Sequence, residues 1–407
     1  MKSSIFIRGA RRLALCATLS VLTAFGARAE DITVKLGVLN DMSGVYADLS
    51  GQGSVVAAQM AADDFMARNP GFKVEVVSAD HQNKPDIGAS IARKWYDQDG
   101  VDAILDVPTS SVALVVSDIT REKNRIFLVS GGGSSDLTGA KCSPNTVQWT
   151  YDTWALANGT GVAVTRRGGT SWFFVTADYA FGAALERDAA AAVTKAGGKV
   201  VGSVKHPLST SDFSSFLLQA QASGAKVVGF ANAGGDLVNS IKQASEFGLV
   251  QGGQTLAGLL IFSGDVKALG LKAAQGLLLT EAFYWDLNDE TRAFSKRFAD
   301  KFGGRMPIST QAGVYSSALH YLNAIRDAKT KDALKVMAQM RATPIDDPLF
   351  GKGEVRIDGR ATHPMYLFQV KTPAESKGPW DLYTLMATIP ANEAFRPLAD
   401  GGCPLVK

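Results

Sequence analysis

The sequence predicts an α/β protein with two lobes, each built around a parallel β-sheet. Apolar runs of strand length alternate with patterns of helical spacing from Ile32 to about residue 280, and the series restarts near residue 150. Repeated β-α-β units of this kind form parallel sheets. The chain has 407 residues, which exceeds the size at which a single core keeps growing, so two lobes are expected.

The first series of elements begins with a strand and a helix that stops at Asn69, before Pro70 and Gly71. A further helix covers about 86–98, and a helical pattern joins the last two strands of the series. The predicted strands are 34–39, 74–77, 103–107 and 126–130. In a parallel sheet the last two strands end at the same edge, where open α/β folds bind ligands.

The second series repeats this alternation of strands and helices, and a mainly helical stretch and short strands come after it. Helices are predicted over about 153–166, from Phe181 to Gly197, from Asp212 and over 236–247. The predicted strands are 172–176, from 199, 226–230, near 256–262 and near 276–280. Residues 289–341 are mainly helical, and short strands follow Gly351. Because no low-complexity linker occurs, brief crossings should join the lobes, which suits a hinge.

The first 29 residues have the pattern of a secretory signal peptide. A basic start is followed by an apolar stretch, Leu13 to Phe25, which is too short to span a bilayer, and by the small-x-small site Ala27-Arg28-Ala29. Arg11-Arg12 leaves a twin-arginine signal open as an alternative. Removal leaves 378 residues with 37 basic and 39 acidic side chains. This balance does not favour nucleic acid as a partner.

Two cysteines remain after removal of the predicted signal, Cys142 and Cys403. In an oxidising compartment an even pair indicates one disulfide. It would tie the C-terminal tail to the end of the first lobe. Two free thiols are the alternative.

The ends of two neighbouring strands are small and polar. Residues 103–107 lead into Pro108-Thr109-Ser110-Ser111, and residues 126–129 lead into Ser130-Gly-Gly-Gly-Ser-Ser135. Hydroxyl groups and free N–H groups at a helix start suit a carboxylate. Serine also caps helices, and the two roles are compatible because the carboxylate sits where the cap would. The glycine run is not G-x-G-x-x-G, so a dinucleotide site is not predicted.

The sequence does not favour catalysis, a cofactor or a metal. His81, His206, His320 and His363 are far apart, without a nearby cysteine. The hydrolase, zinc-protease and P-loop motifs are not found. Three acids lie near strand ends and resemble a paired-acid site: Asp41, Asp80 and Asp106. They leave a hydrolase as a minor alternative.

Several motifs, in their order and spacing, resemble the type I periplasmic solute-binding proteins of ABC importers, in the branch of Leu/Ile/Val-binding proteins. The resemblance covers essentially the whole chain after the signal. Its motifs are 35–44, Thr109-Ser110-Ser111, 130–138, 176–182 and 232–236. A sub-branch that includes binders of aromatic carboxylates is similar at 142–145, 150–152 and Gly402-Cys403-Pro404.

This resemblance implies two Rossmann-like lobes, joined by a three-crossing hinge, that close on a ligand in the periplasm. The implied lobes are 30–149 plus about 283–360, and 150–282 plus about 361–407. It also implies a monomer that delivers its ligand to a membrane permease served by separate ATPase subunits. The residues implied to bind the ligand are Ser110, Ser111, Gly132 and Ser134 for a carboxylate, Tyr179, and Asp236 for an ammonium group.

Aromatic residues near loop ends favour an aromatic carboxylate over a branched-chain amino acid as the ligand. Several rings together form a flat apolar slot. Besides Tyr179, those predicted to contact ligand are Tyr46, Tyr151, Phe230 and Tyr284. Asp236 is the discriminating residue, because an aromatic acid without an amine leaves a desolvated carboxylate unpaired; it is otherwise a helix cap. A sensor that presents its closed state to a receptor is a further alternative.

Overall fold

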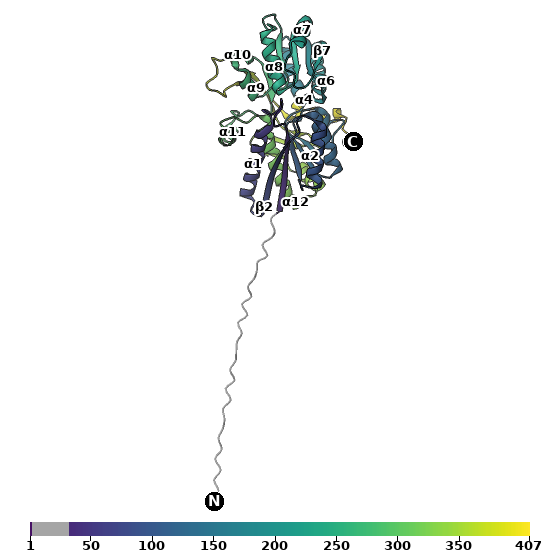
Figure 1. Cartoon of the computed structure of the whole chain (residues 1–407), viewed down its shortest axis with the longest axis vertical. Coiled ribbons are helices and arrows are strands. Elements are labelled where there is room, and N and C mark those ends of the chain that lie inside the picture. The colour runs from purple at the N-terminus through teal and green to yellow at the C-terminus, as the bar shows by residue number, and fades with distance from the viewer. Residues whose placement is uncertain (2–31) are drawn as a thin grey trace.

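Two lobes lie one above the other in the computed structural model, which describes residues 32–407 besides Met1 (Figure 1). The predicted signal peptide therefore lies outside the described residues. The first lobe, purple to blue in the lower half of the view, is built on a five-stranded parallel sheet of order β2-β1-β3-β4-β5. The second, teal in the upper half, is built on a four-stranded parallel sheet of order β7-β6-β8-β9. The two predicted parallel sheets are confirmed.

The first lobe follows the predicted alternation closely. Strand β1 pairs with both β2 and β3, and β3 pairs with β4, all in parallel register. The elements are β1 (Ile32–Asn40), α1 (Gly51–Arg68), β2 (Phe72–Asp80), α2 (Pro85–Asp97), β3 (Ala103–Asp106), α3 (Ser110–Glu122), β4 (Ile126–Val129), the 3-10 helix η1 (Ser135–Thr138) and β5 (Thr146–Gln148).

The second lobe departs from the predicted elements at two strands. The strand expected near 276–280 is outside the parallel sheet and pairs antiparallel with residues 366–369. The strand expected near 256–262 ends at Gly258, and Phe262 precedes a helix whose Asp265 accepts the Phe262 N–H at 2.8 Å. The elements are α4 (Thr153–Leu156), the π-helix η2 (Ala157–Gly161), α5 (Val162–Arg166), β6 (Ser171–Ala177), α6 (Ala180–Lys195), β7 (Lys199–His206), α7 (Ser214–Ala222), β8 (Val227–Ala231), α8 (Gly234–Glu246), β9 (Thr255–Gly258), α9 (Ser263–Leu269), α10 (Leu271–Ala274) and β10 (Leu278–Glu281).

The chain then returns to the first lobe, where α12 packs against α1, β3 and β4. Its buried face includes Tyr321, Leu322 and Ile325, which belong to the large core cluster that extends through both lobes. The elements are α11 (Asp289–Lys301), α12 (Ser309–Ala328), α13 (Ala333–Ala342), and the small antiparallel sheet β11 (Ile345–Asp347), β12 (Gly351–Val355) and β13 (Ala361–Thr362).

The last part of the chain forms a second antiparallel sheet, in which β14 (Met365–Val370) lies between β10 and β15 (Tyr383–Ile389). After α14 (Ala391–Ala394) and the 3-10 helix η3 (Leu398–Gly401), the chain reaches the first lobe again. There Cys403 forms a disulfide with Cys142, and Arg396 donates to the Ser135 carbonyl at 3.0 Å. The predicted disulfide is thus present, whereas the exact division of the chain between the lobes stays a prediction.

The chain passes between the lobes after β5, after β10 and after β13, and its C-terminal tail returns to the first lobe at Cys403. The first three passages correspond to the three-crossing hinge that the resemblance implied. None of the helices within residues 32–407 is long and apolar enough to cross a membrane.

Candidate functional site

The loops that follow the sheet strands of both lobes meet at a small cavity between the lobes. Its first-lobe wall comes from the loops after β1, β3 and β4, and its second-lobe wall from those after β6, β8 and β9. All nine lining residues are uncharged: Tyr46, Leu49, Pro108, Gly131, Tyr151, Tyr179, Phe181, Ala233 and Leu260. This is the sheet edge where the sequence predicted a ligand.

Three predicted tyrosines converge on this cavity. Tyr46 of the first lobe and Tyr179 of the second place their hydroxyl oxygens 2.5 Å apart. The Tyr151 hydroxyl donates to the Gly131 carbonyl at 2.6 Å. Burial raises the pKa of Tyr46, Tyr151 and Tyr179 above the ordinary phenol value, so all three are neutral at physiological pH.

The lobes are closed on each other at this point. The Gly235 N–H of the second lobe donates to the Val45 carbonyl of the first at 2.9 Å. Gly234 has a φ of +57°, and a Cβ on it would lie 2.4 Å from the same carbonyl, so this contact requires glycine. The remaining cavity measures about 10 Å³, far below the ~150 Å³ that holds a benzene ring. A ligand must therefore enter while the lobes are apart.

The two serine loops of the first lobe are joined to each other. The Ser110 hydroxyl, at the start of α3, accepts the Ser134 N–H at 3.1 Å. The Ser134 hydroxyl accepts the Asp136 N–H at 3.3 Å and caps η1. Ser111 is half-buried at the second position of α3. The Gly132 carbonyl accepts from the Gln148 amide at 2.8 Å. Ser110 is thus joined to Ser134 directly, and Gly132 is joined to Ser134 through Gln148, which also donates to the Ser134 carbonyl. None of the four predicted carboxylate-binding residues lines the cavity itself.

Asp236 lies at the start of α8, beside the tyrosine pair, and its negative charge raises the pKa of both Tyr46 and Tyr179. Its Oδ2 accepts the Ser209 N–H at 3.0 Å, whereas its Oδ1 is buried without a partner. Burial raises the pKa of Asp236 to about 6. One oxygen therefore orders the loop after β7, and the other is available to a donor.

Two predicted aromatic residues lie apart from the cavity. Phe230 is fully buried on β8 within the core of the second lobe. The Tyr284 hydroxyl donates to the Trp380 carbonyl at 2.7 Å in the same core. Neither lines the cavity, and their ligand contact stays a prediction. Six residues that do line it lay outside the predicted set of binding residues: Leu49, Pro108, Gly131, Phe181, Ala233 and Leu260. Only Leu49 and Leu260 of these stand outside the motifs and polar runs of the sequence.

The turn after β3 has an unusual backbone. Asp106 and Val107 have φ angles of +78° and +54°, a region that a β-branched residue such as valine rarely adopts. Strain of this kind persists where surrounding structure enforces it, often at functional sites. Asp106 is fully buried, and burial raises the pKa of its carboxyl to about 7. From the sequence alone, Asp106 fits only the minor alternative of a hydrolase.

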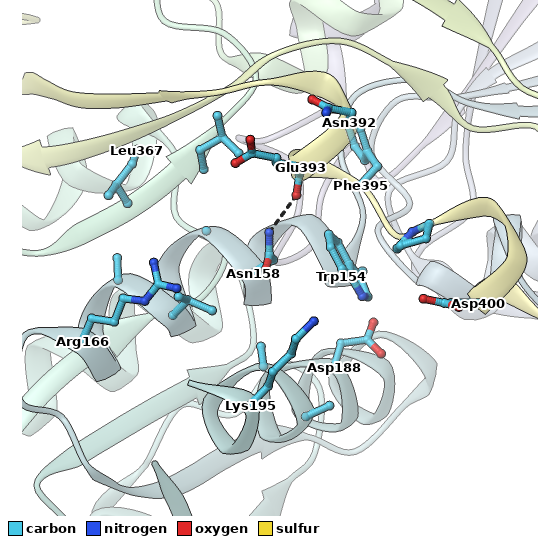
Figure 2. A pocket seen from close by; sticks show the side chains of 17 residues that line it. Trp154, Asn158, Arg166, Asp188, Lys195, Leu367, Asn392, Glu393, Phe395 and Asp400 are labelled. Carbon is cyan, nitrogen blue, oxygen red and sulfur yellow. Dashed lines mark hydrogen bonds between the residues drawn. The ribbon is translucent and has the colours of Figure 1, made fainter. Parts of the chain in front are cut away.

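A larger cavity of about 590 Å³ lies between α4–α5, α6 and the segment that contains α14 (Figure 2). Asn158 spans it by donating to the Glu393 carbonyl at 2.9 Å. Lys195 and Trp154 project into it, whereas Arg166 lies at its edge. It shares no lining residue with the cleft.

Two parallel-sheet lobes that close on a shared cleft define the class of solute-binding proteins. Residues 33–379 match the family model described as periplasmic binding protein, so the chain belongs to that family. It is therefore a periplasmic solute-binding component of the ABC-transporter type, which binds a small molecule and interacts with a membrane permease. Proteins of this family bind their substrates and are not enzymes.

Several known proteins are similar over most of their length. A periplasmic binding protein from Burkholderia mallei is 50% identical, with a TM-score of 0.90 over 92% of this chain and 99% of that one. A branched chain amino acid ABC transporter periplasmic ligand-binding protein from Burkholderia xenovorans LB400 is 40% identical, with a TM-score of 0.81 over 92% and 100%. Leu/Ile/Val-binding protein homolog 6 of Brucella melitensis is 28% identical, over 87% of this chain and 90% of its own.

Structures with benzoate-type ligands share the fold at lower identity. A solute-binding protein of an ABC transporter from R. palustris, in complex with benzoate, is 22% identical with a TM-score of 0.78, over 88% of this chain and 97% of that one.

Proposed function

We propose that this protein captures an aromatic carboxylate, such as a benzoate or cinnamate derivative, and delivers it to a permease. The observation that carries the proposal is the wall of the cleft, where three tyrosines and Phe181 surround a space lined only by uncharged residues. When the lobes separate, these rings form a slot that can hold a flat ring on both faces.

The serine unit beside the slot provides the carboxylate end of the proposed site. Ser110 and Ser111 occupy the first turn of α3, where unpaired N–H groups and the helix dipole favour an anion. The ligand carboxylate is proposed to bind at Ser110, Ser111, Gly132 and Ser134, with its ring toward Tyr46, Tyr151 and Tyr179. A ligand held by both lobes favours a closed form in which the tyrosine walls stand far enough apart to enclose it, through its higher affinity for that form.

A branched-chain amino acid is the second candidate, and a specific observation favours it. The unpartnered Oδ1 of Asp236 is an acceptor for an ammonium group beside the tyrosine pair. Such a ligand would relieve the cost of an unsatisfied buried oxygen. The relative from Burkholderia xenovorans, which is 40% identical, is described as a branched chain amino acid protein.

A thermal-shift screen on refolded, ligand-stripped protein separates the two candidates. Benzoate, 4-hydroxybenzoate and cinnamate are compared with leucine, isoleucine and valine, and benzamide serves as the control with a ring but no carboxylate. A ligand at 100 times its Kd stabilises the native state by about 2.7 kcal/mol. We expect benzoate-type acids to raise Tm and benzamide not to. A shift with the aliphatic amino acids alone would replace the first candidate with the second.

A further inference from the structure

Buried polar atoms without a hydrogen-bond partner concentrate at the cleft edge of the first sheet. Among the described residues, twelve buried side-chain atoms lack a partner, and six of them lie at or just after the ends of its strands or at the start of α1. Their residues are Asn40, Ser54, His81, Asp106, Ser130 and Thr150. Buried polar atoms are paired in the great majority of cases, so this concentration leaves polar groups at the cleft edge free to bind water or a ligand.

Asp106 lies directly behind two residues of the cavity wall, Pro108 and Gly131. A Cβ built on Gly131 would lie 2.9 Å from Asp106 Oδ1 and 2.8 Å from the Pro108 Cα, and both Gly131 and Pro108 line the cavity. Any side chain at position 131 would collide with this carboxyl group. The left-handed backbone of Asp106 and Val107 turns the chain at this point.

The two carboxyl oxygens of Asp106 differ in their surroundings. Oδ2 accepts a long hydrogen bond of 3.4 Å from the Asn40 amide, whereas Oδ1 has no partner. Hydrogen bonding with the Ser54 hydroxyl lowers the pKa of Asp106, although the geometry between Ser54 and Asp106 lies outside that of an ordinary hydrogen bond. Burial outweighs both effects and raises this pKa.

The described groups around Asp106 supply no positive charge to stabilise an ionised carboxylate. On the β1 side these are Asn40 and the Asp41 carboxylate, which accepts the Gly44 and Tyr46 N–H groups. From α1 comes the neutral Ser54. From the crossing segment after β5 comes Tyr151, whose pKa is raised by burial and by Asp106. At the end of β2, burial lowers the pKa of His81 to about 4, so its ring is neutral too.

We propose that Asp106 is a further ligand-binding residue: it acts as a neutral carboxylic acid whose Oδ1 donates a hydrogen bond to the carboxylate of the bound solute. This inference rests on the proposed function in requiring a carboxylate ligand. The ligand would lie between the Ser110 turn and the Gly131–Ser134 loop, and Oδ1 reaches it past Gly131, which has no side chain. An ionised Asp106 would repel the same ligand, whereas a neutral acid donates a strong charge-assisted hydrogen bond.

The test compares affinities at two pH values by calorimetric titration of the full mature chain with benzoate, or with leucine if the screen selects it. If only protein with a neutral Asp106 binds, the apparent Kd equals the intrinsic Kd divided by the fraction of protein in which Asp106 is neutral. With a pKa of about 7, wild-type Kd should rise about tenfold from pH 6 to pH 8. Asp106→Asn has an amide that donates at every pH. It should bind severalfold more weakly than wild type at pH 6, and its Kd should change less than twofold between pH 6 and pH 8. Asp106→Leu should bind poorly at both.

Glu281→Gln is the matched control, because Glu281 is another fully buried acid with a raised pKa but lies at the end of β10, outside the cleft lining. It should keep the tenfold change. The inference is overturned if the Kd of Asp106→Asn keeps the wild-type pH dependence, if that of Glu281→Gln loses it, or if wild-type binding strengthens as pH rises.

A second measurement needs no variant. Titrations at pH 7.5 in buffers of different ionisation enthalpy report the protons exchanged on binding. The inference requires net proton uptake by the wild type, because part of the free protein is ionised at Asp106. Zero exchange or proton release contradicts it. Failure of the proposed function is a distinct result, namely no binding of any aromatic acid at either pH.

Discussion

The hydroxyl groups of Tyr46 and Tyr179 join the two lobes across the cleft, with 2.5 Å between their oxygens. Each tyrosine also lines the cavity. The same pair therefore holds the lobes together and forms part of the slot that a ligand must enter, so closure and ligand entry compete for these side chains.

Tyr46→Phe should shift the ligand-free protein toward an open form. The variant loses one interlobe hydrogen bond, worth about 0.5–1.5 kcal/mol, but keeps its ring. Small-angle scattering of the ligand-free protein should show a larger radius of gyration than the wild type. Tyr284→Phe is the control, because its hydroxyl bonds to Trp380 within the second-lobe core. Equal scattering curves for all three proteins would contradict a role in closure.

Ser110→Ala combined with Ser134→Ala should weaken carboxylate binding by at least tenfold, measured by calorimetry. The double variant removes two hydroxyl groups from the proposed carboxylate site and also the bond from the Ser134 N–H to Ser110. Ser117→Ala, on the same helix but paired with Thr146, is the control and should alter stability alone. Unchanged affinity in the double variant would refute the assignment of these serines.

Asp236→Asn distinguishes the two ligand classes by its effect on Kd. For an aromatic acid we expect less than a threefold change, because the amide oxygen can still accept the Ser209 N–H that Asp236 now accepts. For an amino acid the loss of charge opposite the ammonium group should weaken binding more than fiftyfold. A large loss with benzoate would show that Asp236 contacts the acid itself.

Glu281→Gln should change how the stability of the protein depends on pH. Glu281 accepts from Ser309 at 2.7 Å and from Tyr383 at 3.0 Å, and burial raises its pKa to about 8. The folded state therefore binds more protons than the unfolded state between about pH 4.5 and 8, so Glu281 makes stability fall as pH rises through that window. The difference in Tm between the variant and the wild type should therefore shift by several degrees in favour of the variant from pH 5 to pH 8. A constant difference would contradict the raised pKa.

Loss of the disulfide should destabilise the protein by about 2–5 kcal/mol. Cys142 and Cys403 are separated by 261 positions, so the bond restricts a long loop in the unfolded chain. The measurement is urea unfolding of a variant that combines Cys142→Ser with Cys403→Ser, compared with the oxidised wild type. Reductant should lower the wild-type midpoint and leave that of the variant unchanged; an effect on both would point to another cause.

The local pattern of this sequence determined its strands, helices and fold class. Apolar runs such as 103–107 and 126–130 were recognisable because buried parallel strands are continuous in hydrophobicity, and the polar residues after them located the cleft edge. The disulfide was also predictable, because few cysteines leave few pairings. The strand expected near 256–262 was too long, since the apolar residues after Gly258 are buried by packing rather than by sheet pairing.

The tertiary structure alone decided which residues share the cleft. Tyr46, Tyr151 and Tyr179 line it while Phe230 and Tyr284 lie in the second-lobe core, although all five follow or end strands in the sequence. The direction of a side chain at a loop depends on contacts with distant segments, which spacing does not encode. The same holds for Asp106: its burial, its unpaired oxygen and its contact with Gly131 arise only when β1, β3 and β4 are assembled, because charge and hydrogen bonding in a protein interior depend on what surrounds a group in space.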